Sequence, residues 1–202
     1  PHLDLSEAKE IFKNLTKQNK TASNIKFPEL AFEQLGSNPL LIEYIFLITK
    51  GKMLSDLLSE QIQIMQDKNE DFKIEVLRRI VFSNTVGAPV LLQKLIRTLP
   101  ENYDCQKIIE CIVDEFITVD DKNYVYPLHN IRTKHLCELL HGKYINPIDT
   151  AMKIISCIPK EYTNIFIRNA VNYPNFNTKE FVLQLIDYSK SKKIELSLVL
   201  NN

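Results

Sequence analysis

Apolar residues recur at helical spacing along most of the chain. The first such segment begins at Ser6, the expected N-cap, and a short second helix ends at Gly36. The segment PLLIEYIFLIT, residues 39–49, is apolar on nearly all sides, so we expect a buried helix with Pro39 near its first position. A further amphipathic segment, KMLSDLLSEQIQIM, completes a helical region over residues 1–70.

The pattern changes between residues 71 and 145. Three helical segments, EVLRRIVFSN, PVLLQKLIRTL and YDCQKIIECIVDEF, precede two short β-prone runs, FITV and YVYP. The DDKN sequence between these runs is typical of a turn, so a β-hairpin is expected. Three helices followed by a hairpin is the order of a winged helix. A helix from about Ile131 to Leu140 follows, and Gly142 is its expected stop.

The remaining residues, 146–202, are expected to form helices with short breaks. Pro147 and Pro159 lie near predicted helix starts, where proline is tolerated. This order is similar to the opening of a helical-repeat array, but no clean repeat period is visible. The predicted fold class is therefore mostly α, with a helical region over 1–70, a winged-helix region with one β-hairpin over 71–145, and a repeat-like helical segment.

Composition narrows the class of protein. The 202 residues include 25 basic and 25 acidic side chains, so the overall charge does not favour a polyanion. No apolar run reaches the roughly 18 residues that a membrane span needs, and the start lacks a signal peptide. We expect a cytoplasmic location without membrane contact. Because the chain lacks an initiator Met, we also expect it to be a fragment of a longer protein.

The cysteines and histidines do not form a recognisable metal motif. The cysteines are Cys105, Cys111, Cys137 and Cys157. Each lies in an apolar helical pattern without a C-x-x-C pair, so we interpret them as core residues of a reduced protein. The histidines at 129, 135 and 141 are six residues apart, which directs neighbouring members to different helix faces. We expect no metal, and each histidine is interpreted as a cap or a surface residue.

Catalytic motifs are also missing from the sequence. There is no G-x-x-x-x-G-K-[ST] phosphate loop, no H-E-x-x-H and no G-x-S-x-G. A Ser-His-Asp or Cys-His pair built from distant residues stays open. On these residues the chain is not expected to be an enzyme by itself.

A winged helix raises the possibility of DNA binding, which the charges disfavour. The non-core positions of the expected recognition helix are Asp104, Gln106, Lys107, Glu110, Asp114 and Glu115. Four acids against one lysine would repel phosphates, so nucleic acid is not an expected partner. A basic patch of Arg78, Arg79, Lys94 and Arg97 is interpreted mainly as solvated surface. A DNA-binding transcription regulator and a helical protein–protein interaction scaffold are the two alternatives kept.

Two stretches carry a family resemblance. HLDLSEAKEIFKNL, followed by LAFEQLGSNPLLIEYIFLITKGKMLSDLLSEQI, resembles the helical lid that follows the nucleotide-binding core of STAND-type NTPases. These are AAA+-related signalling ATPases that include NOD-like and plant resistance proteins. Their lid has a Gly-x-Pro-type signature at a helix start, which reads GSNPL here, with one extra residue between Gly36 and Pro39. In the family a winged helix and sensor helices follow the lid, and the resemblance covers about residues 2 to 145 as an order of elements.

The resemblance also implies a nucleotide contact. A Met-His-Asp signature lies where the family's wing hairpin meets the next helix, and its histidine contacts the β-phosphate of ADP in the closed state. Here Leu128, His129 and Asn130 take the three positions, and Asn130 replaces the acid. Pro39, with Asn38 beside it, is expected on the adenine side of the nucleotide. The alternative is that His129 only caps a helix and Pro39 only starts one.

The implied function is regulatory. The resemblance implies that the catalytic core lies upstream, outside this chain, and that the chain binds no cofactor in isolation but contacts ADP or ATP when joined to that core. Its partners would be the upstream NTPase core of the same polypeptide and a protein bound through the C-terminal helices. A lid and winged helix that contact nucleotide in only one state would couple the nucleotide to a C-terminal helical sensor.

Overall fold

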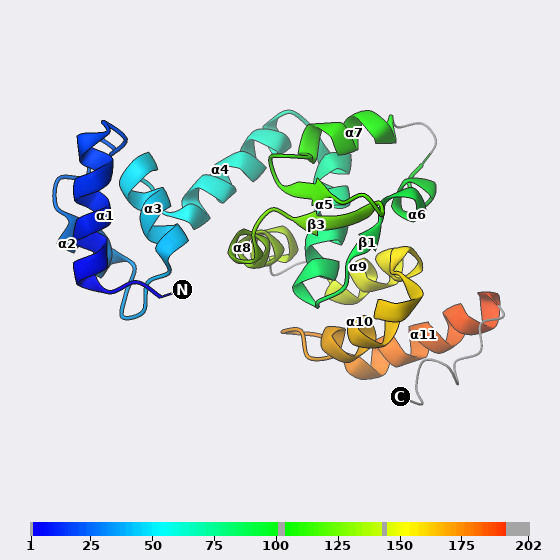
Figure 1. Cartoon of the computed structure of the whole chain (residues 1–202). Coiled ribbons are helices and arrows are strands. Elements are labelled where there is room, and N and C mark those ends of the chain that lie inside the picture. Colours follow the sequence, from blue (N-terminus) through cyan, green and yellow to red (C-terminus); the bar gives the residue numbers. More distant parts are fainter. Residues whose placement is uncertain (1, 101–103, 143–144, 193–202) are drawn as a thin grey trace. The chain divides into compact units, whose positions relative to one another are not determined.

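The computed structural model describes residues 2–100, 104–142 and 145–192, and this part of the chain is mostly helical (Figure 1). The chain divides into two compact units, residues 1–63 and 64–202. Among the described helices, none combines the length and the apolar content needed to cross a membrane.

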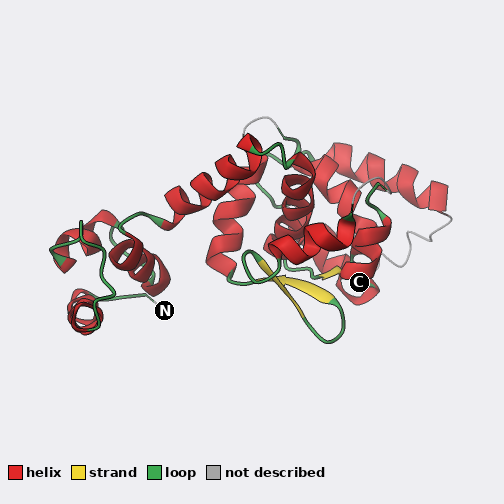
Figure 2. Ribbon diagram, turned by 90° about the horizontal axis from the view of Figure 1, so that it is seen from above, coloured by secondary structure: helices red, strands yellow, loops and turns green. Residues whose placement is uncertain are grey.

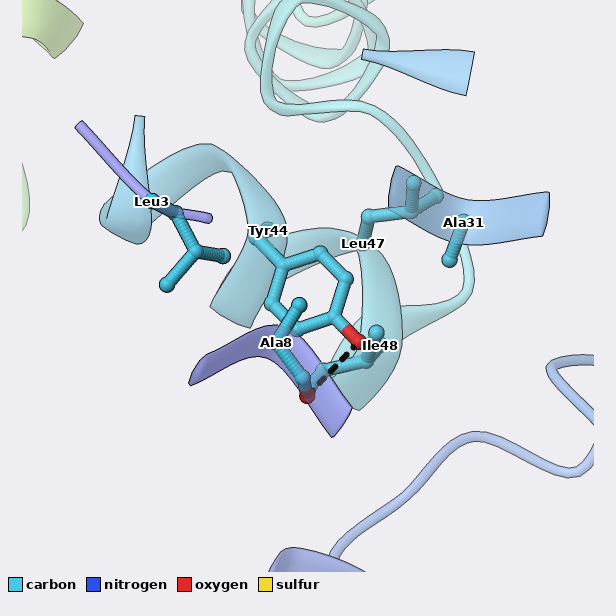
Figure 3. Packing of buried hydrophobic residues seen from close by; sticks show 6 residues of the cluster. All are labelled: Leu3, Ala8, Ala31, Tyr44, Leu47 and Ile48. Carbon is cyan, nitrogen blue, oxygen red and sulfur yellow. Dashed lines mark hydrogen bonds between the residues drawn. The ribbon is translucent and has the colours of Figure 1, made fainter. Parts of the chain in front are cut away.

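The first unit packs its helices around one small core. Its elements are α1 (Leu5–Lys17), α2 (Pro28–Gln34), α3 (Leu41–Lys50) and α4 (Leu54–Asp67), and the last of these includes the boundary between the units. The buried cluster consists of Leu3, Ala8, Ala31, Tyr44, Leu47 and Ile48 (Figure 3). The Tyr44 hydroxyl donates to the Ala8 carbonyl at 3.1 Å, and burial raises the pKa of Tyr44 to about 12. A neutral, hydrogen-bonded phenol therefore connects α3 to α1 inside an apolar core.

The N-terminal cap of α1 differs from the prediction. Asp4, and not Ser6, is the N-cap, and its carboxylate accepts from the Glu7 backbone N–H at 2.8 Å. The Glu7 carboxylate accepts in return from the Asp4 backbone N–H at 3.0 Å. This reciprocal capping box satisfies two helix-end donors, which explains why the helix begins before Ser6.

The start of α3 also differs. Leu40 is its N-cap, so Pro39 precedes the helix and the predicted place near the first helical position is wrong. The cause is a pairing with the N-terminal segment, in which the Leu3 N–H donates to the Pro39 carbonyl at 3.0 Å and His2 bridges Leu40. This pairing keeps the segment extended. Gly51 ends the helix in the left-handed conformation, as expected.

The second unit begins with helices and a small sheet. Its first elements are α5 (Asp71–Thr85), β1 (Val90–Leu91), α6 (Leu92–Arg97), α7 (Cys105–Ile112), β2 (Ile117–Val119), β3 (Tyr124–Pro127) and α8 (Asn130–His141). The three strands are antiparallel in the order β1–β3–β2. Figure 2 shows the strands in yellow among the helices. The β2–β3 hairpin was predicted, whereas β1 was not, because its residues continue into the helical pattern of α6.

Local chemistry accounts for the turn between β2 and β3. The Asp120 carboxylate accepts from the backbone N–H groups of Lys122 at 2.9 Å and Tyr124 at 2.8 Å, and Asn123 has a φ of 61°. Asp and Asn are suited to both roles. By contrast, α7 is shorter than predicted, because Val113 is extended and bridges Ile117, the first residue of β2.

The helical tail packs on α5. It consists of α9 (Pro147–Ile154), two short 3₁₀ turns (Ile155–Cys157 and Lys160–Tyr162), α10 (Thr163–Ala170) and α11 (Thr178–Lys192). Phe82 of α5 is fully buried, and its ring centroid lies 6.1 Å from that of Phe166 on α10 and 5.2 Å from that of Tyr173. The tail and α5 therefore share one core.

The cysteines are all free, and the core prediction fits only some of them. Cys137 and Cys157 are buried, Cys105 is half-buried and Cys111 is exposed. The core interpretation of Cys111 is therefore wrong. Its helix buries Ile109 and Ile112 instead, which lie on the opposite side of the helical pattern.

Candidate functional site at the start of α8

His129 occupies the corner between the sheet and a helix. β3 ends at Pro127, and His129 follows in an extended conformation as the N-cap of α8. The ring Nδ1 accepts a hydrogen bond from the Ile131 backbone N–H at 3.2 Å, and the His129 carbonyl accepts from the Thr133 backbone N–H at 3.0 Å. The residue therefore satisfies part of the helix end with its own ring, in the place where serine or aspartate usually serves.

This cap determines which ring nitrogen carries the proton. A neutral imidazole has one donor and one acceptor nitrogen, and Nδ1 is the acceptor here. Nε2 is then the N–H donor, and within the described residues it has no hydrogen-bond partner. The half-buried ring thus keeps one directed donor for a group outside this part of the chain.

The residues beside His129 are exposed. Leu128 is held through its backbone, whose N–H donates to the Phe116 carbonyl at 3.2 Å, and its side chain is 39% exposed. Asn130, at the position of the family's acid, is also exposed. All three residues of the predicted signature are therefore gathered at one corner, with the imidazole the most enclosed of them.

Sequence reasoning missed Arg132, in the first turn of α8. Its guanidinium carbon lies 5.8 Å from the Phe116 ring centroid, and its buried Nε has no hydrogen-bond partner within the described part of the chain. Burial lowers the pKa of Arg132, an effect that the charge of Glu115 opposes. An arginine in the first turn opposes the helix dipole, and that mismatch is the signal that sequence reasoning had available.

The other predicted nucleotide contacts lie in the first unit. Pro39 is buried, because the N-terminal segment pairs with it. Asn38 is exposed, and its carbonyl oxygen lies 3.3 Å from Nδ1 of His2. Asn38 and Pro39 are neighbours, whereas His129 belongs to the other unit.

A second histidine, His141 at the C-terminal end of α8, is buried, so its interpretation as a cap or surface residue is wrong. Nδ1 donates to the Cys137 carbonyl at 2.9 Å, and Nε2 accepts from the Thr150 hydroxyl at 3.2 Å. A cavity of about 480 Å³ lies beside this ring, next to Tyr173. Both ring nitrogens are already used, so His141 offers no free nitrogen to a ligand in that cavity.

Cys137 and His141 lie close together, but they do not have the properties of a catalytic cysteine–histidine pair. The Cys137 Sγ lies 3.6 Å from Nδ1 of His141 and 3.3 Å from the Tyr173 hydroxyl. Burial raises the pKa of the Cys137 thiol and lowers the pKa of His141. A nucleophilic cysteine needs the opposite shifts, so the pair is interpreted as a polar core contact.

The basic patch predicted on the first helices is partly an internal ion-pair network. The Glu75 carboxylate pairs with Arg78 and, at 3.0 Å each, with Arg79 and with Lys153 of α9. Arg78 also donates to the Leu140 carbonyl at 2.9 Å. The solvated-surface interpretation is therefore wrong for Arg78 and Arg79. Arg78 connects α5 to α8, and Arg79 pairs with Glu75, which connects α5 to Lys153 on α9.

Comparisons with known proteins add no family assignment, because no family model, curated protein or solved structure matches this chain.

Proposed function

We propose that this chain is a regulatory, non-catalytic part of a STAND-type signalling ATPase. In this proposal His129 contacts the phosphate of ADP held by a neighbouring nucleotide-binding core. The order helix, strand, two helices and hairpin, with the sheet order β1–β3–β2, is compatible with a winged helix. The corner after that hairpin is where the family resemblance expects the histidine.

The Nε2 donor of His129, which has no partner among the described residues, is the observation that carries the proposal. The two alternatives posed by the sequence, a cap or a phosphate contact, are compatible, because the cap uses Nδ1 and the contact would use Nε2. The cap also fixes the orientation of the ring, so little rotamer freedom remains to be lost on binding. An N–H donor beside a helix N-terminus is suited to an anionic oxygen.

The switch would then work through a contact made in only one state. If ADP-bound core and His129 meet only in the closed form, ADP stabilises that form by the free energy of this contact. The tail shares a core with α5, so a movement of the hairpin and α8 would be passed to the C-terminal helices as one body. Those helices are proposed as the sensor or partner-binding part.

DNA binding receives less support. The exposed side chains of α7 include Gln106, Lys107 and Glu110, and its N-cap is Asp104, so acids outnumber bases on this surface. Two of the four basic residues that favoured DNA, Arg78 and Arg79, are engaged by Glu75. A surface of this charge would not gain the counterion release that phosphate contacts provide.

A protein-binding scaffold is the second candidate, and one observation favours it. Val182 and Leu183 on α11 are 42% and 55% exposed, so this helix presents two adjacent apolar side chains that a partner could cover. Deletion of residues 1–63 is the appropriate test, because a deletion that also removed α5 would take away the helix on which α9 packs. Partner binding by residues 64–202 alone would support this candidate.

The test of the main proposal uses the natural protein that contains this chain. Its coding sequence should include a phosphate-binding loop upstream, and the absence of such a loop would overturn the proposal. In that protein His129→Ala should accelerate ADP dissociation about tenfold, the usual effect of losing one charge-assisted hydrogen bond. His129→Asp is the sharper variant, because aspartate caps helices well but repels phosphate. Unchanged ADP dissociation in both variants would contradict the proposal.

A further inference from the structure

We infer that the junction of α5 and α9 is a binding site for an oxyanion, a phosphate or carboxylate group, held by Arg79 and Lys153. This site goes beyond the proposed nucleotide contact and depends on none of its residues. It rests on the charges, burial and open hydrogen-bond donors of one side-chain cluster.

The cluster has more positive than negative charge. Within the described residues, the Glu75 carboxylate lies within ion-pair distance of three cations, Arg78, Arg79 and Lys153. Arg79 Nε and Lys153 Nζ both lie 3.0 Å from the same oxygen, Glu75 Oε1, so the two cations are close neighbours. One carboxylate does not neutralise three cations, so this group of four side chains keeps a net positive charge that favours a further anion.

Arg79 is the central residue of the site. The residue is only 8% exposed, yet within the described part of the chain its guanidinium forms a hydrogen bond only through Nε. The two terminal nitrogens therefore keep their N–H donors without a protein acceptor. Neither terminal nitrogen is among the buried atoms that lack a partner, so both can be reached from outside, and the planar fork matches the oxygens of a carboxylate or phosphate.

The site is reachable from solvent through Lys153. The Lys153 side chain is 52% exposed, so an anion can approach from its side. Lys94 of α6 is exposed, and its charge, like that of Arg79, acts on the Cys157 thiol, whose pKa burial raises.

Titration calorimetry on the full chain tests this inference. Inorganic phosphate and acetate serve as separate probes at constant ionic strength, with chloride as the balancing ion. We expect saturable binding of at least one probe, and the stronger probe identifies the class of oxyanion. Lys153→Ala should weaken it about tenfold, whereas Lys107→Ala on α7, with the same loss of charge, should not.

Glu75→Gln provides a readout that a purely structural role would not give. Removing the competing carboxylate frees Arg79 and Lys153 for the ligand, so the affinity should rise. If Glu75→Gln does not fold, Lys153→Ala and Lys107→Ala decide the question, because both change exposed side chains. The inference is overturned if neither probe binds saturably, or if Lys153→Ala and Lys107→Ala weaken binding equally.

Discussion

The two ends of α8 each carry a histidine, and the two rings have opposite hydrogen-bonding roles. At the start, His129 accepts through Nδ1 and keeps Nε2 as an open donor. At the end, His141 donates through Nδ1 and accepts through Nε2, so both nitrogens are used inside the core. The comparison shows that the same side chain is a candidate contact in one environment and a structural link in the other. The occupancy of the ring nitrogens, and not the residue type, makes the difference.

The largest expected effect is at the buried end. His141→Ala removes a ring that lies 5.4 Å from Phe82 and 5.8 Å from Tyr173, and it leaves the Thr150 hydroxyl and the Cys137 carbonyl without their partner. We expect the free energy of unfolding to fall by about 2–4 kcal/mol in urea denaturation. Lys134→Ala, an exposed change on the same helix, should cost less than about 0.5 kcal/mol. Equal losses in the two variants would contradict the structural role of His141.

Gly142, which ends α8, should give the next largest effect. Its φ of 52° and ψ of −150° lie in a region that other residues rarely adopt, and no atom lies near the position of an added Cβ. Gly142→Ala therefore costs backbone strain alone, about 1–3 kcal/mol, in the same unfolding measurement. A neutral result would mean that the end of α8 relaxes easily.

A smaller effect is expected at the open end. His129→Ala should destabilise the chain by about 1 kcal/mol, the usual cost of losing an N-cap. His129→Asn should restore most of that loss, since asparagine caps through its own side-chain oxygen. If alanine and asparagine are equally stable at this position, the ring does not contribute a cap.

The pH dependence of stability should also separate the two ends. Burial lowers the pKa of His141 below its ordinary value of 6.5, so the unfolded chain binds this proton more readily than the folded one. The contribution of neutral His141 to the free energy of unfolding is complete above pH 6.5. It declines as the pH falls from 6.5 towards the pKa of His141 in the folded chain. His141→Gln should flatten the unfolding free energy between about pH 7 and pH 5. If the pH dependence of the unfolding free energy is unchanged in His141→Gln, other titratable groups cause it.

Local sequence chemistry predicted more of the fold than of the site. The DDKN turn, the stop at Gly142 and the proline at the start of α9 follow from properties of single residues, and the structure agrees with them. The β1 strand was missed because two residues form a strand only through pairing with β3, far along the chain. The position of His129 was predicted, but its tautomer depends on the Ile131 hydrogen bond. The burial of His141 depends on Phe82, Thr150 and Tyr173, which no local pattern around α8 indicates.

The tautomers of the two histidines can be measured directly by long-range ¹H–¹⁵N NMR of the imidazole rings in this chain, at a pH where both are neutral. The central claim is that His129 caps α8 through Nδ1 and presents Nε2–H to a ligand. We predict the Nε2–H tautomer for His129 and the Nδ1–H tautomer for His141. An Nδ1–H tautomer at His129 would contradict the claim, because the ring would then neither cap the helix nor keep Nε2 as a donor.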